Sequence, residues 1–443
     1  MLKVVKFGGS SLAEASRYEN VKNIVLADDS RRAVVVSAPG KRNSADNKIT
    51  DLLYLCHAHV QYGVDYRNIL DLIKSRYAEI ADGLNANFDA EAEFAAIEEK
   101  LVNGADKEFL VSRGEYLSAR IMAAHLGFDF VDSYGHVFFN YDKSINREKT
   151  YAAFKEAFEK SSGKIVVPGF YGTMPDGSLA LMSRGGSDIT GSLLAAALNA
   201  DKYENWTDVS GILMADPALV ENPYPIPNIS YDELRELTYM GAKVLHEASV
   251  SPVRDAGIPV VIKDTGNPEA PGTLIAEKFE ESESDRDKFY ITGIAGRKGF
   301  SVVDVHYEDL AHNLEVLRQA LKILENHNLV IDQLSTGVDG FNFLVPTDSV
   351  KSHIYAIIAE FEEKFGKGCI TVTDNIALVA CVSRLMACRP GISGSLFSAL
   401  GKNDISIRTI SQGASELNII IGVSNDDYKK AVQVLYDRFT KRG

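Results

Sequence analysis

The chain has 443 residues, of which 45% are hydrophobic and 24% are charged, which is the composition of a globular protein and the length of two or three domains. The formal net charge of −14 argues against nucleic acid or an anionic membrane as a partner, because both surfaces would repel the chain. A small-molecule ligand is therefore expected.

Location and redox state follow from two further observations. The amino terminus lacks a basic segment followed by an apolar segment and a cleavage site, and no apolar run reaches the roughly 20 residues that cross a bilayer. Cys56, Cys369, Cys381 and Cys388 form no CxxC pair and have no nearby histidine cluster. We expect a cytoplasmic chain with reduced thiols and without a metal-binding cage.

The first 276 residues have the pattern of an α/β domain. Short β-branched runs alternate with helical stretches such as residues 106–126. The runs lie at residues 4–7, 33–37, 128–132, 165–167, 203–209 and 258–262. This alternation predicts a mainly parallel sheet with helices on both faces.

A lysine and two glycines follow the first of these strands, in the stretch KFGGSS at residues 6–11. Ligands of open α/β sheets bind outside the carboxyl ends of the strands, and glycines let several backbone N–H groups approach an anion. A lysine adds a point charge that suits phosphate oxygens. The stretch matches neither GxxxxGK[ST] nor GxGxxG, so a tight strand-to-helix turn is the structural alternative.

Glu115 lies on the predicted helix at residues 106–126, in a row whose other members are small or apolar. A carboxylate in such a row is unfavourable unless a cation pairs with it. Arg113 or Arg120 would provide that cation in a structural salt bridge, and a ligand ammonium is the functional alternative.

A second glycine-rich connection, SRGGSD at residues 183–188, again joins a predicted strand to a helix. Arg184 suits a carboxylate or a phosphate, because its guanidinium can donate two parallel hydrogen bonds, and Asp188 falls in the first turn of the helix. A helix cap and a surface ion pair are the structural alternatives. Two such loops at strand ends nevertheless indicate one shared anionic ligand.

Two further stretches have groups that suit a nucleotide. TDVSG at residues 207–211 closes a strand with hydrogen-bonding groups for a ribose or an adenine, and GAKVLH at residues 241–246 offers Lys243 among small residues. A plain turn and a solvated lysine are the structural alternatives.

The composition changes at residues 276–288, AEKFEESESDRDK, where the run of charges indicates a domain boundary. Beyond it lies an internal repeat, in which Ser335 aligns with Ser411 at an offset of 76 residues. Each copy has the pattern strand, helix, strand, strand, helix. We expect two small α+β modules that either pack as structural units or bind a ligand where they meet.

Together these stretches resemble the aspartokinases of the amino-acid kinase family. The motif SAPG, followed by TDLL at residues 50–53 after a longer segment at 41–48, and the motif NPEAPGTLI at residues 267–275 add to the resemblance. The repeated tail is similar to the paired ACT modules, of ferredoxin-like α+β fold, that such kinases carry. The resemblance covers essentially the whole chain and leaves no residues for a fused homoserine dehydrogenase.

The resemblance implies four parts in the chain. These are an amino-acid kinase catalytic domain at residues 1–276, a charged linker at 277–288, a first ACT module at 289–370 and a second at 371–443. A strand near residues 289–296 could belong to the second module. Pairing of ACT modules between subunits implies a homodimer or a homotetramer.

The activity implied is transfer of the γ-phosphoryl group of MgATP to the β-carboxylate of L-aspartate, which gives 4-phospho-L-aspartate. This reaction opens lysine, threonine and methionine biosynthesis. Mg²⁺ would bridge phosphate oxygens without a dedicated protein cage. No general base is needed, because the attacking carboxylate is already ionised at neutral pH.

Motif positions assign roles to residues. By resemblance, Lys6, Gly8 and Gly9 stabilise the transferring phosphoryl group, and Asp188 orients Lys6 or holds the amino group of the substrate. The residues implied to bind aspartate are Thr50, Glu115 and Arg184. The residues implied to bind the nucleotide are Lys6, Gly8, Gly9, Ser10, Thr207, Asp208, Lys243 and Val244.

Regulation is expected in the first ACT module, which by resemblance binds an end-product amino acid through Asp332, Ile331 and Val330. Lysine is the first expectation and threonine the second. Gly337 and Val338 stand where lysine-binding relatives have a serine-glutamate pair, which leaves the effector open.

Other classes of protein stay open on the residues alone. A kinase of glutamate, N-acetylglutamate or carbamate would use the same loops, although Arg184 and Glu115 together favour a free α-amino acid. A catalytically idle amino-acid sensor would keep the tail, but intact Lys6, Arg184 and Asp188 argue against it. A nicotinamide-dependent dehydrogenase is disfavoured by the missing dinucleotide fingerprint.

Overall fold

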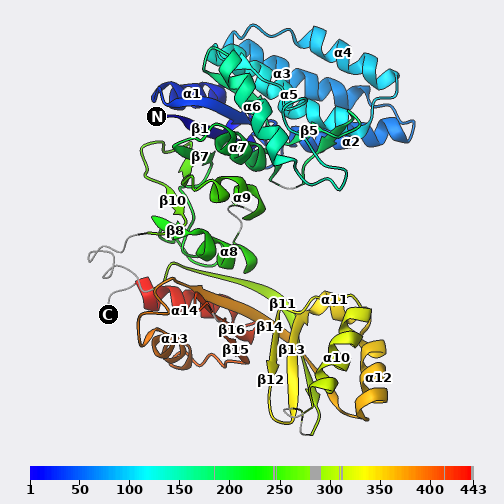
Figure 1. The fold of residues 1–443 in the computed structure, drawn as a ribbon, viewed down its shortest axis with the longest axis vertical. Helices are drawn as coiled ribbons and strands as arrows, with labels where there is room; N and C mark the ends of the chain where they lie inside the picture. Colours follow the sequence, from blue (N-terminus) through cyan, green and yellow to red (C-terminus); the bar gives the residue numbers. More distant parts are fainter. Residues whose placement is uncertain are drawn as a thin grey trace. The chain divides into compact units, whose positions relative to one another are not determined.

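The chain folds into two compact units in the computed structural model (Figure 1). The structure describes residues 1–183, 185–242, 245, 247–279, 291–308, 310, 313–413 and 415–440, without the side chains of 247 and 248. Unit 1 comprises Met1–Ile212, Pro225–Tyr231 and Val244–Phe279, and unit 2 comprises Leu213–Tyr224, Asp232–Lys243 and Glu280–Gly443. Two segments of the predicted catalytic domain thus group with unit 2. The predicted linker at residues 277–288 lies mostly outside the described residues, and the domain boundaries stay a prediction.

Unit 1 is built on an eight-stranded sheet. In spatial order its strands are β3 (Asp129–Phe130), β4 (Ile165–Pro168), β2 (Arg31–Val36), β1 (Lys3–Phe7), β7 (Lys202–Thr207), β9 (Val260–Asp264), β10 (Thr273–Ala276) and β8 (Asn228–Ser230). The strands from β3 to β9 are parallel, and β10 runs antiparallel to β9. Each β-branched run of the sequence lies in this sheet, so the predicted α/β fold is confirmed.

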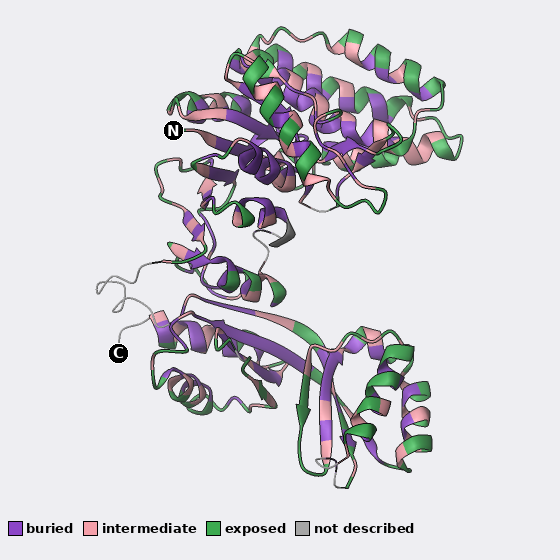
Figure 2. Cartoon of the chain, viewed as in Figure 1, coloured by how far each residue is buried: buried purple, intermediate pink, exposed green. Residues whose placement is uncertain are grey.

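Helices cover both faces of this sheet. The elements on the side of α5 are α1 (Ala15–Leu26), α2 (Ile49–Gln61), α3 (Arg67–Leu84), α4 (Ala90–Val102) and α5 (Lys107–Leu126). Those on the side of α7 are α6 (Arg147–Lys160), α7 (Gly186–Ala197) and α9 (Glu247–Asp255). A short helix η1 (Gly9–Leu12) and a hairpin of β5 (Tyr171–Thr173) and β6 (Leu179–Leu181) complete the unit. Figure 2 shows that burial is concentrated in the strands and in α7.

The alternation of side chains along β1 decides what faces each layer of helices. Val5 and Phe7 belong to the apolar core shared with α1 and α5, where Phe7 stacks on Trp206 with ring centroids 5.9 Å apart. Because successive side chains of a strand point to opposite faces, Lys6 points towards α7. The central strand therefore carries a cation on the α7 face of the sheet.

The helix that carries Glu115 has clear ends. Its N-cap Asp106 accepts a hydrogen bond from the backbone N–H of Phe109 at 2.8 Å, and its C-cap Gly127 has a left-handed φ of 68°. The helix predicted for residues 106–126 is thus observed as α5. It packs on β2, β3 and β4, which brings the middle of the helix over the sheet.

Unit 2 holds a six-stranded antiparallel sheet in the order β12-β13-β11-β14-β16-β15. The first copy of the repeat contains β11 (Gly293–His306), α10 (Leu314–Asn326), β12 (Gln333–Thr336), β13 (Gly340–Pro346), α11 (Thr347–Lys351) and α12 (Ile354–Phe365). The second contains β14 (Ile370–Val382), α13 (Ile392–Gly401), β15 (Thr409–Ser411), β16 (Asn418–Ser424) and α14 (Tyr428–Thr440). The predicted order of elements is confirmed in the second copy, and the first copy differs only in having two helices, α11 and α12, where one was predicted. Strands β11 and β14 pair along most of their length, so the two modules share one sheet.

Helix α8 (Tyr231–Tyr239) belongs to unit 2 except for its first residue. The carboxylate of Glu233 on this helix is fully buried and accepts hydrogen bonds from the Arg384 guanidinium at 3.2 Å and from the Thr292 hydroxyl at 2.5 Å. The helix is therefore fixed to the sheet of unit 2 by a buried charge. Among the helices in the described ranges, none combines the length and the apolar character that crossing a membrane requires.

Candidate active site

A cavity of about 730 Å³ lies in unit 1 at the carboxyl ends of the central strands. The predicted site residues that line it are Lys6, Gly9, Ser10, Thr50, Glu115, Asp188 and Asp208. They come from the loop after β1, the first turn of α2, the middle of α5, the first turn of α7 and the end of β7. Segments far apart in the sequence thus meet at one site, as the two glycine-rich loops predicted.

Other predicted site residues are not among those that line the cavity. Gly8 and Thr207 flank it, because the backbone N–H of Gly8 donates to the carbonyl of Trp206 at 3.2 Å and Thr207 follows that residue. Arg184, Lys243 and Val244 lie outside the described residues, and their assignments stay predictions.

An ion pair between Lys6 and Asp188 lines part of the cavity. Nζ of Lys6 lies 2.7 Å from Oδ1 of Asp188, which is in the first turn of α7. The buried amide of Asn205 donates to the same oxygen at 2.8 Å, and its own oxygen accepts from Lys6 at 3.5 Å. Asp188 therefore holds the ammonium of Lys6 in place, and its part in the reaction stays a prediction.

Asn205 is a site residue that the sequence motifs did not reveal. It pairs with Lys6 in the register of β1 and β7, so both side chains stand on the α7 face of the sheet. Its position two residues before the TDVSG motif, in phase with buried Tyr203, was the available signal. A polar residue in phase with the buried face of a central strand needs a partner, and Asp188 provides it.

The loop after β1 is shaped by close contact between two backbones. A side chain on Gly9 would place its Cβ 2.6 Å from the carbonyl oxygen of Ala38, and one on Gly40 would lie 2.8 Å from the backbone of Gly9. The N–H of Gly40 donates to the carbonyl of Gly9 at 2.8 Å. The need for glycine at position 9 thus comes from the neighbouring segment as well as from any ligand.

Glu115 is a buried carboxyl group of the cavity with one unpartnered oxygen. One oxygen, Oε1, accepts a hydrogen bond from the backbone N–H of Ala38 at 3.1 Å, whereas the buried Oε2 has no partner among the described residues. Burial raises the pKa of this carboxyl to about 8. A ligand cation beside Glu115 would lower this pKa and favour the ionised carboxylate.

The structural alternatives for Glu115 do not hold. Arg113 lies over the ring of Tyr116 at 4.2 Å and donates to Ser112, and Arg120 pairs with Glu93 at 3.0 Å. Aromatic stacking and a surface partner satisfy both guanidinium groups elsewhere. The carboxylate of Glu115 is left for a ligand.

The predicted effector residues lie in the first module of unit 2. Val330 is exposed, Ile331 packs partly on the module core, and the side chain of Asp332 is 5% exposed. The Asp332 carboxylate accepts from the Arg297 guanidinium at 2.5 Å and from the Tyr239 hydroxyl of α8 at 2.9 Å. A ligand ammonium at this position would have to compete with both groups.

Comparison with known proteins identifies the class. The model of the amino acid kinase family matches residues 1–264, and an ACT domain model matches residues 379–439. The chain belongs to the amino acid kinase family. It is also similar over its full length to Aspartokinase 3 of Bacillus subtilis (strain 168), at 33% identity over 453 residues that cover 99% of this chain and 98% of the relative. The resemblance to aspartokinases is confirmed.

Solved structures have the same fold. Aspartate kinase of Clostridium acetobutylicum is 42% identical, with a TM-score of 0.90 over 99% of both chains. E. coli aspartokinase III with aspartate and ADP is 26% identical, with a TM-score of 0.74 over 100% of both chains. Its complex with lysine and aspartate is 26% identical, with a TM-score of 0.72 over 99% of this chain and 100% of the other.

The raised pKa of Glu115 predicts a pH-dependent stability. Between about pH 4.5 and pH 8 the unfolded chain releases the Glu115 proton whereas the folded, ligand-free chain keeps it, so rising pH lowers the free energy of unfolding. Glu115→Gln removes this dependence, so its free energy of unfolding should gain up to about 5 kcal/mol relative to wild type across the window. Urea unfolding of both proteins at closely spaced pH values measures the difference, and parallel pH profiles would contradict the unpaired state of Glu115.

Proposed function

We propose that the protein transfers the γ-phosphoryl group of ATP to the β-carboxylate of L-aspartate and forms 4-phospho-L-aspartate. The observation that supports this most directly is that one cavity is lined by the ammonium of Lys6 and by the buried, unpartnered oxygen of Glu115. A cation for a phosphoryl group and an anion for an amino group are thus available in one site. The full-length similarity to aspartokinases supports aspartate as the amino acid.

The roles of the residues follow from their positions. Lys6, held by Asp188, faces the charge that develops on the transferring phosphoryl group, together with the backbone of Gly9. Glu115 takes the α-ammonium of aspartate, and Thr50 hydrogen-bonds the same substrate. By motif position Arg184 takes the α-carboxylate. The attacking carboxylate is already ionised, so the site needs orientation and electrostatic stabilisation but no base.

Magnesium fits the residues at the phosphate end. Asp188 and Asp208 both line the cavity, and carboxylates are oxygen donors of the kind that Mg²⁺ takes. The ion would neutralise charge on the β- and γ-phosphates. By motif position, the residues that bind the nucleotide also include Gly8, Ser10, Thr207, Lys243 and Val244.

We further propose a cytoplasmic location.

We also propose that the first ACT module binds an end-product amino acid near Asp332, and that the protein assembles as a homodimer or a homotetramer through these modules. The E. coli relative has been solved with lysine, which supports lysine as the first effector to test. Threonine is the second, because Gly337 and Val338 replace the serine-glutamate pair of lysine-binding relatives.

One assay tests the activity and its regulation together. Purified protein with MgATP, L-aspartate and hydroxylamine should form aspartyl hydroxamate, because hydroxylamine displaces phosphate from the acyl phosphate product. Lysine and threonine are added in separate reactions to identify the effector. Glutamate or N-acetylglutamate as the better substrate would reassign the kinase, and no turnover with any amino acid would favour an idle sensor.

Lys6→Ala should lower kcat by roughly 100- to 1000-fold, because it removes one donor aimed at developing charge. Steady-state kinetics at saturating ATP and aspartate measures the loss, with thermal unfolding as the control for folding. Near-normal turnover in a folded variant would refute the role of Lys6.

Glu115→Gln should raise the KM for aspartate by roughly 10- to 100-fold, because the amide cannot neutralise the substrate ammonium. The KM for ATP should change little. The two constants are measured separately with the other substrate saturating. The opposite pattern, with ATP affected and aspartate unaffected, would overturn the ammonium assignment.

A further inference from the structure

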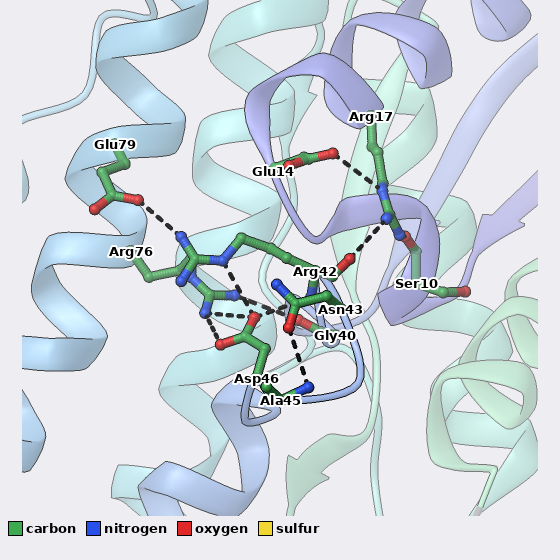
Figure 3. Close-up of polar contacts among 10 residues, drawn as sticks. All are labelled: Ser10, Glu14, Arg17, Gly40, Arg42, Asn43, Ala45, Asp46, Arg76 and Glu79. Atoms are coloured by element: carbon green, nitrogen blue, oxygen red, sulfur yellow. Dashed lines mark hydrogen bonds and ion pairs between the residues drawn. The ribbon is translucent and has the colours of Figure 1, made fainter.

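The longer segment at residues 41–48 borders the cavity through its first and last residues. Figure 3 shows the polar contacts that hold the segment. The segment connects the backbone contact at Gly40 to the start of α2 at Ile49. Lys41 and Lys48, close to its two ends, both line the cavity. The segment therefore takes part in the site, although none of the catalytic motifs contains it.

A buried arginine of α3 holds this segment in place. Arg76 is 6% exposed, and its Nη2 donates to both carboxylate oxygens of Asp46, at 2.6 and 2.8 Å. Its Nη1 donates to the carbonyl of Gly40 at 3.4 Å. Removal of Asp46 would leave the buried guanidinium of Arg76 without its carboxylate partner, which is costly.

Asp46 is also bound from within the segment. It accepts from the backbone N–H of Arg42 at 2.9 Å and from Nε of the same residue at 3.2 Å, and Arg42 reaches Glu79 of α3 at 3.1 Å. Burial acts to raise the pKa of Asp46, but the hydrogen bonds from Arg42 and Arg76 outweigh it and hold the pKa well below its usual range. The carboxylate of Asp46 is thus ionised at neutral pH, and its hydrogen bonds with Arg42 and Arg76 are kept.

Arg17 joins this segment to the glycine-rich loop. Its Nη1 donates to the carbonyl of Ser10 at 2.6 Å and its Nη2 donates to the carbonyl of Arg42 at 3.3 Å, as Figure 3 shows. The N–H of Gly40 adds a bond to Gly9. Two connections, the Arg17 bridge and the bond between Gly40 and Gly9, therefore fix the segment and its preceding residue to the glycine-rich loop.

The two lysines of the segment differ from the other cations of the cavity. Lys6 is paired with Asp188, and Arg17 is bonded to backbone carbonyls and lies 3.4 Å from Glu14. Lys41 and Lys48 are exposed, and within the described ranges the ammonium of neither forms an ion pair or a hydrogen bond. A fixed segment thus presents two cations to the cavity without a protein partner for either.

We propose that Lys41 and Lys48 bind anionic oxygens of the ligands, and that Arg76, acting through Asp46, is the residue that positions them. The inference rests on the proposed function, because a nucleotide and a dicarboxylic amino acid are the two anionic ligands of that reaction. Phosphate and carboxylate oxygens share this chemistry, so each ligand is tested separately.

Calorimetric titration of the full-length protein with ATP, and separately with aspartate, tests the lysines without requiring turnover. The double variant Lys41→Met, Lys48→Met should raise the Kd of at least one ligand by roughly 10-fold, the size expected for charge-assisted hydrogen bonds. A raised Kd for ATP identifies phosphate as the partner, and a raised Kd for aspartate identifies a carboxylate. Unchanged Kd values for both ligands would overturn the inference. Wild-type protein that binds both ligands but never forms the hydroxamate would instead contradict the proposed function.

Arg76→Met tests the positioning role, with Arg67→Met as the matched control because Arg67 lies on the same helix and its side chain is 69% exposed. Arg76→Met should raise the same Kd as the lysine variant, whereas Arg67→Met should not. In the double-lysine background Arg76→Met should add less than about twofold, because the cations that it positions are already absent. If Arg76→Met raised the Kd by the same factor in the double-lysine background as in wild type, the positioning role would be overturned. Asp46→Asn serves the same comparison if Arg76→Met does not fold.

Discussion

The ion pair between Lys6 and Asp188 is the interaction on which the site of unit 1 depends. It joins the end of the central strand to the first turn of a helix that packs against that strand, so its geometry requires the sheet, the register and the helix to be in place together. Asn205 completes the link from the neighbouring strand. The lysine is thereby held at a fixed point, and a fixed cation stabilises developing charge without reorganising during the reaction.

Glu115, which lines the same cavity, has no such partner. Glu115 is buried without a cation of its own, which costs stability in the ligand-free protein. The guanidinium groups of Arg113 and Arg120 are within reach along the helix, yet aromatic rings and Glu93 hold them away. An unpaired buried carboxylate in a cavity is therefore a property of the fold, and a ligand ammonium would relieve it.

The sequence predicted the features that depend on local pattern and missed those that depend on distant partners. Alternating β-branched runs and helices, the capped helix around Glu115 and the duplicated tail were all readable, because periodicity and spacing encode them. The role of Asn205 and the bond between Arg76 and Asp46 could not be predicted from the sequence. The latter joins residues 30 positions apart, and nothing in the local sequence distinguishes either residue from a solvated surface charge. The partners of Arg113 and Arg120 could not be predicted either, because the aromatic rings and the acid beside them come from the tertiary fold.

In unit 2, buried and paired carboxylates also hold helix α8. Glu233 is neutralised by Arg384, and Tyr239 at the end of the helix shares the carboxylate of Asp332 with Arg297. Because the side chain of Asp332 is 5% exposed, its negative charge needs these donors as long as no other cation is present. A ligand ammonium at Asp332 would compete with the Arg297 guanidinium and the Tyr239 hydroxyl for the same carboxylate oxygen. A ligand at Asp332 would therefore change a contact at the carboxyl end of α8, while Glu233 keeps the helix on the sheet. The chain continues from that end of the helix into the GAKVLH stretch at residues 241–246.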